Sequence, residues 1–278
     1  MSLLALSCAP SAPVDLVDQV GNAVPSGAPR RIVALAPDVT ELAFAIGAGP
    51  LLVATSRTAD YPPAALGLPR VSPDDVEAVV ARSPDLVLAT TAGNDPRVVD
   101  RLRGLGIAVC TFDVTSLARL VDAVSLAGRV MGREQAAAAL AADLSTRIAA
   151  AGRRAATLSR RPALYVVWWE PLIVAAPGTF HDDLLRLAGL DGTAPRVAGR
   201  YPRVDPEVLL DTRLAIVVAP DEPDVRATFT AVSTRPVAGR IRSGATRVIW
   251  LPADAVSRPG PRLVDALELL VAAREAAP

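Results

Sequence analysis

Short apolar runs alternate along the chain with longer segments in which apolar positions follow a helical pattern. Such runs are rich in strand formers and are bounded by proline, glycine or charged residues, which is typical of buried strands. In the first part of the chain they predict strands at 31–36, 51–55, 85–89 and 107–112. Helices are expected between them, from Asp38 (with Glu41 completing a capping box) to Gly47, from Pro73 to Arg82 and from Asn94 to Gly104. This alternation predicts a parallel sheet with helices on both faces.

The same alternation returns after residue 160. It predicts strands at 163–169, 214–219 and 247–251, and helices at 179–187, 206–211 and 262–274. We therefore expect an α/β protein with two Rossmann-like lobes, each built on a parallel sheet. Ligands of such units bind at the carboxyl ends of the strands. This topology places Pro37, Asp38, Arg57 and Tyr61 around the mouth of the first lobe.

A long helix is expected between the two lobes. Residues 133–158 contain no proline and are rich in alanine, leucine and glutamate, which favours helix. A helix of about 26 residues spans about 39 Å, more than one small lobe needs, and we interpret it as a rigid strut. The expected organisation is a tail (1–29), an N-terminal α/β lobe (30–115), a helical connection (116–160) and a C-terminal α/β lobe (161–278).

Composition narrows the classes of function. All 29 basic residues are arginine, and 29 acidic residues balance them, so the zero net charge gives no electrostatic reason to bind nucleic acid. No apolar window of about 18 residues is present, which argues against an ordinary membrane span. The opening MSLLALSCAPSAP resembles the end of a secretion signal, and Ala5 to Cys8 resembles a bacterial lipoprotein processing site. We expect an exported protein, periplasmic or lipid-anchored at Cys8; the alternative is a disordered tail.

Enzymatic signatures are missing from the sequence. Gly47 and Gly49 form a G-x-G that follows a helix and has no third glycine, so it does not fit a dinucleotide fingerprint. The single histidine, His181, cannot build a multi-histidine metal site. It is expected to be a polar residue in the first turn of its helix, and the alternative is a single axial ligand to cobalt or haem iron. We predict no catalysis, no cofactor and no resident metal; an α/β enzyme acting on a nucleotide-like substrate is the remote alternative.

Aromatic residues stand where predicted strands hand over to loops. They are Tyr61, Trp168 or Trp169, and Tyr201. Adjacent strand residues point to opposite faces, so one tryptophan of the pair is expected to face a cleft and the other the core. Core packing explains any one of them, but together they indicate platforms for a large flat ligand held between the lobes.

Two pairs of charged residues suggest two further roles. Asp254 and Arg258, four apart before the last helix, are candidate polar anchors for a ligand or else a surface ion pair. Glu77 and Glu207 each stand nine residues before a predicted strand residue, Leu86 and Ile216. They either complement a helix dipole or engage two matching basic sites on a dimeric partner.

The chain resembles the substrate-binding proteins of cobalamin and ferric-siderophore ABC importers from Val14 to its end. The similarity is carried, in order, by RIVALAPDVTELAFAIG, ADYPP, VEAVVARSPDLVLA, WWEPLIVAAPGTFHDDLLRLAGLDG, YPRVDPEVLL and SRPGPRLVDALELL. The resemblance implies two α/β lobes bridged by one long helix. It also implies that Glu77 and Glu207 dock onto arginines of a dimeric membrane permease.

The cobalamin-binding members offer a residue-by-residue comparison. Tyr61 matches their corrin-contacting tyrosine, Tyr201 stands where they often carry tryptophan, Asp254 and Arg258 match a ligand-binding pair, and Trp168 falls near an aromatic contact position. The loop before Asp74 lacks a tryptophan found in them, and Thr91 replaces another aromatic residue, which leaves a ferric siderophore or haem open. The leading prediction is an exported receptor that captures a corrinoid. Pro37 and Arg57 complete the predicted ligand site.

Overall fold

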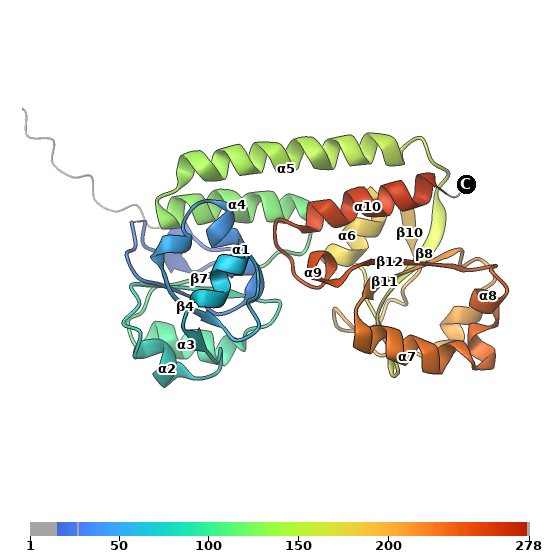
Figure 1. Cartoon of the computed structure of the whole chain (residues 1–278), viewed down its shortest axis with the longest axis horizontal. Coiled ribbons are helices and arrows are strands. Elements are labelled where there is room, and N and C mark those ends of the chain that lie inside the picture. The colour runs from blue at the N-terminus through green and yellow to red at the C-terminus, as the bar shows by residue number, and fades with distance from the viewer. Residues whose placement is uncertain (1–15, 27, 277–278) are drawn as a thin grey trace, which may run out of the picture.

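The computed structural model describes residues 16–26 and 28–276 and shows two α/β lobes lying side by side beneath a long helix (Figure 1). This arrangement confirms the predicted fold class. The expected secretion-signal remnant and Cys8 lie outside the described residues. No helix in the described ranges combines the length and the hydropathy needed to span a bilayer.

The N-terminal lobe is built on a five-stranded parallel sheet. Its strands, in spatial order, are β5 (Arg70–Val71), β4 (Leu52–Ser56), β3 (Ile32–Ala34), β6 (Leu86–Thr90) and β7 (Val109–Phe112). Alternate residues of β3 enter different hydrophobic clusters, Ile32 on one face and Val33 on the other. Both faces of the sheet are therefore covered, as an all-parallel sheet requires. A two-stranded antiparallel ribbon, β1 (Leu16–Val17) with β2 (Ala23–Val24), precedes the sheet.

Four helices belong to this half of the chain, and their starts differ from the prediction. They are α1 (Pro37–Ala45), α2 (Val76–Val80), α3 (Pro96–Gly104) and α4 (Leu117–Met131), with 3₁₀ turns η1 (Gly49–Leu51) and η2 (Pro63–Gly67). The expected cap at Asp38 is wrong, because Pro37 occupies the first turn, where its fixed φ and missing N–H suit it, and Ala36 is the N-cap. The cap of α2 is Asp75, whose carboxylate accepts from the Ala78 N–H at 2.8 Å.

Asn94 is also not a cap, since Asp95 performs that function for α3. The amide of Asn94 instead ties strand ends together. Its oxygen accepts from the Thr90 N–H at 2.8 Å, and its nitrogen donates to the Leu35 carbonyl at 3.0 Å. Asn94 thereby fixes the loop at the carboxyl ends of β3 and β6.

The C-terminal lobe repeats the plan with a second sheet. The parallel order is β10 (Leu190–Gly192), β8 (Arg161–Trp169), β11 (Ile216–Asp221) and β12 (Arg247–Pro252), and β9 (Leu172–Val174) pairs antiparallel with β8. Its helices are α6 (Phe180–Leu187), α7 (Pro223–Ser233), α8 (Gly239–Arg242), α9 (Ala253–Val256) and α10 (Leu263–Glu275). Residues 206–211, expected as an α-helix, form the 3₁₀ helix η3 (Pro206–Leu210), and η4 (Pro236–Ala238) precedes α8. Helix α7, which was not predicted, covers part of this sheet.

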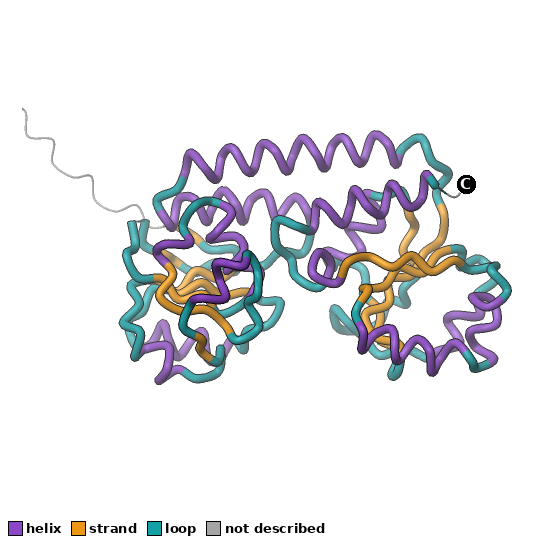
Figure 2. Tube along the Cα trace, in the orientation of Figure 1, coloured by secondary structure: helices purple, strands orange, loops and turns teal. Residues whose placement is uncertain are grey.

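The predicted strut is α5 (Glu134–Ala155), which at 22 residues spans about 33 Å. It lies along α4 of the first half and α10 of the second, so three helices form a layer above both sheets (Figure 2). One hydrophobic cluster runs through this layer, from Leu120 on α4 through Leu144 on α5 to Leu267 on α10. The two lobes therefore share a core at the helical layer and separate below it.

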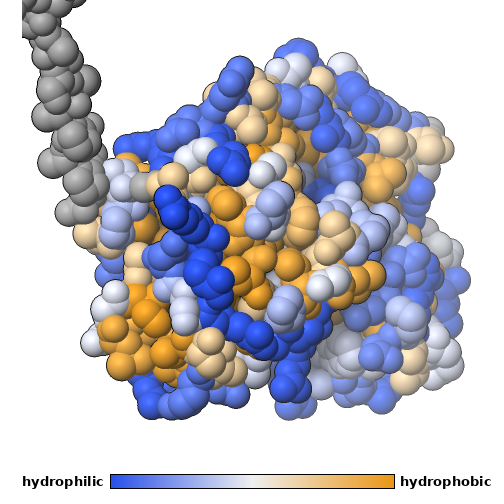
Figure 3. All heavy atoms as spheres, turned by 60° about the vertical axis from the view of Figure 1, so that its left-hand side comes forward, coloured by the Kyte–Doolittle hydropathy of each residue, from blue (hydrophilic) through white to orange (hydrophobic). Residues whose placement is uncertain are grey.

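The outward side of the N-terminal lobe, brought forward in Figure 3, shows apolar surface among hydrophilic surface. Exposed apolar side chains of this lobe include Val17, Leu66 and Leu105. Apolar atoms make up more than half of the surface of ordinary folded proteins, so such residues do not by themselves indicate a partner.

The contact between α4 and α5 depends on a glycine. A Cβ placed on Gly128 would lie 2.3 Å from the Cβ of Ala137, a side chain that is 1% exposed. We expect Gly128→Ala to lower the free energy of unfolding by about 1 to 3 kcal/mol, because the helices must separate. Urea denaturation followed by circular dichroism measures this change.

Gly152 of α5 provides the matched control, since a Cβ there meets nothing within 4 Å. Gly152→Ala should raise the free energy of unfolding by up to about 1 kcal/mol, because alanine favours helix. Equal effects of the two substitutions would contradict the close-packed contact.

Candidate functional site

Three adjoining cavities lie on the side of the C-terminal lobe that faces the N-terminal lobe; residues of both lobes line the two smaller ones, and residues of the C-terminal lobe line the largest. Their volumes are about 190, 190 and 530 Å³. The two smaller ones share Ala92, Phe180 and Tyr201, and Ser257 lines both the first of them and the largest. We call this continuous space the interlobe groove. It runs past the carboxyl ends of β6, β7, β11 and β12, where open α/β sheets bind their ligands.

Aromatic side chains form one wall of the groove. The ring of His181 lies 4.1 Å from that of Tyr165 and 3.9 Å from that of Phe180, and it meets the edge of Tyr201 at 5.7 Å. All four residues line the groove. The hydroxyl of Tyr165 is buried and has no hydrogen-bond partner among the described residues, so the ring of Tyr165 is what this residue contributes to the wall. An apolar ligand face would satisfy this wall.

His181 is neutral in the folded protein. Its Nε2 lies 2.8 Å from the carbonyl oxygen of Val256, to which it must donate, and its Nδ1 is then free to accept from the Tyr201 hydroxyl at 3.4 Å. Burial lowers the pKa of His181 from its ordinary value to about 3. His181 therefore belongs to an aromatic cluster, with its Nε2 committed to the backbone.

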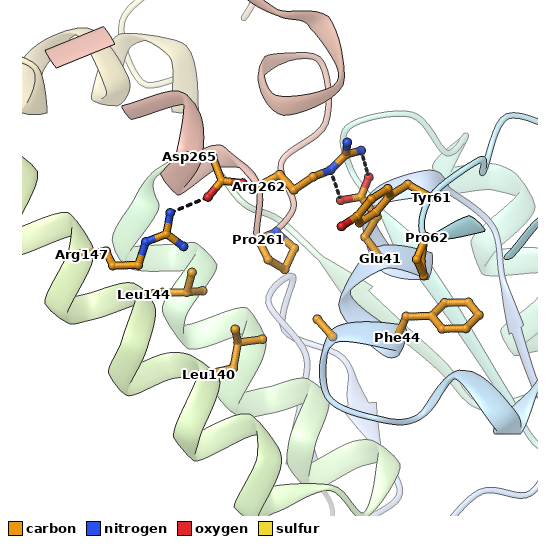
Figure 4. Close-up of a pocket in the computed structure, with 11 residues that line it drawn as sticks. Glu41, Phe44, Tyr61, Pro62, Leu140, Leu144, Arg147, Pro261, Arg262 and Asp265 are labelled. Carbon is orange, nitrogen blue, oxygen red and sulfur yellow. Dashed lines mark hydrogen bonds and ion pairs between the residues drawn. The ribbon is translucent and has the colours of Figure 1, made fainter. Parts of the chain in front are cut away.

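Charged residues close one end of the groove by pairing across the lobes. Glu41 of α1 is 3% exposed and accepts from the Arg262 guanidinium at 2.5 and 2.9 Å, as Figure 4 shows. Arg258 donates to Asp60 and lies 3.6 Å from Glu41. The hydrogen bond from Arg258 lowers the pKa of Asp60. Four charged side chains from opposite lobes thus form one ion-pair network, which we call the interlobe clamp.

The other end of the groove has a smaller bridge between the lobes. Arg200 donates to the Asp113 carboxylate at 3.0 Å and to the Thr91 hydroxyl at 3.3 Å, and Thr91 itself donates to Asp113 at 2.5 Å. Thr91, where an aromatic residue was expected by comparison, therefore takes part in a polar contact instead.

Some of the predicted ligand residues do come together. Tyr201, Asp254 and Arg258 line the interlobe groove, although Asp254 and Arg258 do not pair with each other. Asp254 lies 3.6 Å from Arg262 instead. The ring of Tyr61 stacks beneath the Arg262 guanidinium, 4.0 Å from its carbon, so Tyr61 adjoins the interlobe clamp (Figure 4).

Other predicted residues lie elsewhere. Pro37 and Arg57 line none of the three cavities, although both follow the carboxyl ends of strands. Neither tryptophan of the pair lines the groove. The expected alternation holds as far as Trp168, which lies on the side opposite Tyr165 and Val167, and fails at Trp169, which joins the same hydrophobic cluster as Trp168.

Both tryptophans pack into the core of the C-terminal lobe. Trp169 is 1% exposed and packs 4.8 Å from the Phe229 ring, and Trp168 packs on the same cluster while its indole N–H donates to the Glu170 carbonyl at 2.8 Å. Val167 and Tyr165 line the groove in their place.

A separate cavity of about 320 Å³ lies behind the clamp, against the strut. Leu140 and Leu144 of α5 point into it from one side, and Phe44 of α1 borders it on the other (Figure 4). Arg147, which lines this cavity, is already paired, since it donates to Asp265 at 2.5 Å.

The sequence prediction missed several residues of the groove and of its ion pairs. These are Tyr165, Phe180 and Arg200 of the groove, Asp113, which pairs with Arg200, and Asp60 and Arg262 of the clamp. Tyr165 gave no local signal, because it lies in a run of four buried residues in its strand. The long-range ion pairs have no local signal, because their partners stand far apart in the chain.

Comparison with known proteins agrees with this geometry. A family model described as periplasmic binding protein matches residues 32–240. The chain belongs to the periplasmic binding protein family. It is therefore a substrate-binding transport protein of the exported, periplasmic class and not an enzyme; binding proteins of ABC importers work with a membrane permease and an ATPase.

Relatives and solved structures match over most of the chain. The vitamin B12-binding protein of Vibrio cholerae is 29% identical over 248 residues, which cover 86% of this chain and 87% of that protein. The crystal structure of the periplasmic vitamin B12 binding protein of Vibrio cholerae has a TM-score of 0.78 at 28% identity, covering 90% of this chain and 98% of that one. A periplasmic heme-binding protein in complex with two hemes also has a TM-score of 0.78, at 25% identity, over 90% of this chain and 99% of the other.

The buried His181 should make the protein less stable in acid. The unfolded chain binds a proton at this residue below about pH 6.5, whereas the folded protein does so only near pH 3, so stability is full above pH 6.5 and falls as the pH drops toward 3. His181→Gln keeps a donor for Val256 and does not titrate. Between pH 7 and 4.5, wild type should lose about 2 to 3 kcal/mol more unfolding free energy than the variant.

Urea denaturation at both pH values measures the difference between the two proteins. The comparison of the two proteins is needed because Asp38 also titrates between pH 7 and 4.5. Burial raises the pKa of Asp38 to about 6, so its protonation stabilises the folded protein as the pH falls, opposite to the effect of His181. Parallel pH profiles for wild type and variant would show that His181 is not buried as a neutral side chain.

Proposed function

We propose that this protein captures a corrinoid of the cobalamin type in the interlobe groove and delivers it to the permease of an ABC importer. The observation that carries the proposal is the aromatic wall of Tyr165, Phe180, His181 and Tyr201, in a chain whose vitamin B12-binding relatives match it along most of its length. A macrocycle presents a broad apolar face, and rigid aromatic rings contact such a face at little cost in conformational entropy.

Polar groups at the groove suit the rest of such a ligand. Corrinoids carry amide side chains at their edge, which both donate and accept hydrogen bonds. Ser257, which carries a hydroxyl, and the charged residues Asp254 and Arg258 line the same groove as the aromatic wall. The predicted contacts of Tyr201, Asp254 and Arg258 belong to this proposal, and Tyr61 would contact the ligand only beside Arg262.

The second candidate ligand is haem or a ferric chelate. It is supported by the similarity of the fold to a heme-binding protein at 25% identity, and by the aromatic wall, which suits any flat macrocycle. An axial contact from His181 would require its Nδ1, because Nε2 is bonded to Val256.

The ligand proposal predicts tight binding of cyanocobalamin that depends on Tyr201. Equilibrium dialysis read by absorbance should give a dissociation constant in the micromolar range or below for the wild type. Tyr201→Ala should weaken binding by about tenfold, because it removes an aromatic face from the wall. Leu105→Ala truncates an apolar side chain that is 58% exposed and lies outside the groove, and it should leave affinity unchanged.

Failure to bind cyanocobalamin at micromolar concentration would reject the corrinoid. Binding of haem with a Soret band in that case would establish the second candidate.

Two glutamates occupy equivalent positions in the lobes and are proposed to dock onto the permease. Glu77 and Glu207 each follow an aspartate N-cap by two residues, in α2 and η3 respectively. Each stands nine residues before the first residue of a strand, Leu86 of β6 and Ile216 of β11. Glu77 is exposed beside Arg101 at 3.0 Å, and Glu207 is exposed as well. Matching acids on two similar lobes suit a partner with two-fold symmetry.

Charge reversal at these positions tests the docking role. Glu77→Arg with Glu207→Arg should abolish stimulation of the ATPase activity of the cognate importer in proteoliposomes, because the exposed acids would then face like charges. Corrinoid affinity should stay the same, since neither residue lines the groove. Glu134→Arg, in the first turn of α5, is the control for charge reversal near a helix N-terminus. Unaltered stimulation by the double variant would refute docking through these residues.

A further inference from the structure

We infer that Asp60 and Glu41 make the interlobe groove selective for ligands that carry no carboxylate, by occupying the arginines that a carboxylate would need. The inference rests on the proposed function, because it names the chemical class of ligand that the same groove accepts. It assigns a specificity role to two acids of the N-terminal lobe that contact arginines of the other lobe.

Arg258 is the groove arginine best placed to meet a ligand. It lines the largest cavity and its side chain is 18% exposed. Its guanidinium is nevertheless committed to protein groups. It donates to both oxygens of Asp60, lies 3.4 Å from the Thr58 carbonyl and 3.6 Å from Glu41. A ligand carboxylate could pair with Arg258 only by displacing Asp60.

Arg262 of the adjoining clamp and Arg200 of the groove are committed in the same way. Arg262 is bidentate to Glu41, and its opposite face covers the Tyr61 ring. Arg200 is paired with Asp113. Among the described residues, three arginines of the groove and the adjoining clamp therefore contact four carboxylates, those of Glu41, Asp60, Asp113 and Asp254.

The other charged residues near the groove add no net positive charge to its walls. Asp221 and Glu222 border the largest cavity, and Arg226 compensates Asp221 at 2.8 Å. Arg57 makes no ion pair within the described part of the chain, but it lines none of the three cavities. The groove is thus neutral to negative.

This charge balance separates the two candidate ligands. A ligand carboxylate in the largest cavity would meet Asp221, Glu222 and Asp254, which line it, and like charges across an interface oppose binding. It could reach Arg258 only in competition with Asp60. A neutral amide meets no such penalty. Haem carries two propionates, whereas the side chains of cobalamin are amides. The carboxylates of the clamp therefore favour the corrinoid.

The decisive experiment compares ligands that differ by one charge. Dissociation constants are measured by equilibrium dialysis for cyanocobalamin and for its monocarboxylic acid, in which one side-chain amide is hydrolysed. Wild type should bind the amide form at least about tenfold more tightly than the acid. Asp60→Asn should reduce this ratio by about tenfold, because Arg258 becomes available to the ligand carboxylate.

Matched variants separate the effect of the lost charge on binding from an effect on folding. Asp60→Glu keeps the charge and should keep the ratio near that of wild type. Glu41→Gln should lower the ratio as Asp60→Asn does, although Glu41 is buried and this variant is scored only if its melting temperature shows a folded protein. Asp100→Asn removes an exposed carboxylate paired with Arg103 on α3, far from the groove, and should not change the ratio.

The outcomes distinguish this inference from the proposed function. Equal affinity of wild type for the two corrinoids, or a ratio unaffected by Asp60→Asn, would overturn the inference while the corrinoid receptor stands. If wild type binds no corrinoid, haem and its uncharged dimethyl ester are compared in the same assay. Preference for the ester, lost in Asp60→Asn, would support the inference without the corrinoid; binding of none of the four ligands would reject both.

Discussion

The carboxylate of Glu41 is the charge on which the relation between the two lobes depends. It is nearly inaccessible to water, and two arginines of the C-terminal lobe converge on it. Removing one member of a buried ion pair leaves an uncompensated charge and typically costs about 3 to 5 kcal/mol. The loop from Ser257 to Arg262 packs against α1 at Gly260, where a Cβ would lie at van der Waals distance, 3.4 Å, from the Glu41 carboxylate. The position of the groove follows from this contact.

The lobes are held together at two levels with different physics. Above, a hydrophobic cluster continuous from α4 through α5 to α10 resists bending because its side chains are close-packed. Below, the interlobe clamp and the Arg200 bridge hold the groove edges by ion pairs. A structure held in this way favours a preformed groove over large closure around a ligand, which reduces the ordering cost of binding. Specific charge contacts then decide what the groove admits.

Local sequence patterns predicted the elements well, and contacts between distant residues poorly. The strands preceding the groove and the spacing of Glu77 and Glu207 follow from apolar runs and caps, which are local features. Helix α7 was missed because its threonines and valines favour strands as much as helices. Glu41 matched a capping box, yet its carboxylate pairs with Arg262, 221 residues away in the chain. No periodicity reports such a partner, so the clamp appears only in three dimensions.

The groove lies at the carboxyl ends of strands, as expected for α/β sheets, but not beside the strand ends that carry Pro37 and Arg57. Tyr201 and Arg258 were found by their positions after strands, whereas Trp168 and Trp169 both pack into the core of the C-terminal lobe. Val167, which lies between them and Val166, has no partner in β9, and this has an evolutionary consequence. Because side chains alternate along a strand, a one-codon deletion at Val167 would restore regular pairing and place Trp168 where Val167 now lines the groove. The aromatic content of the binding wall could then change in one mutational step, with no substitution of any ring.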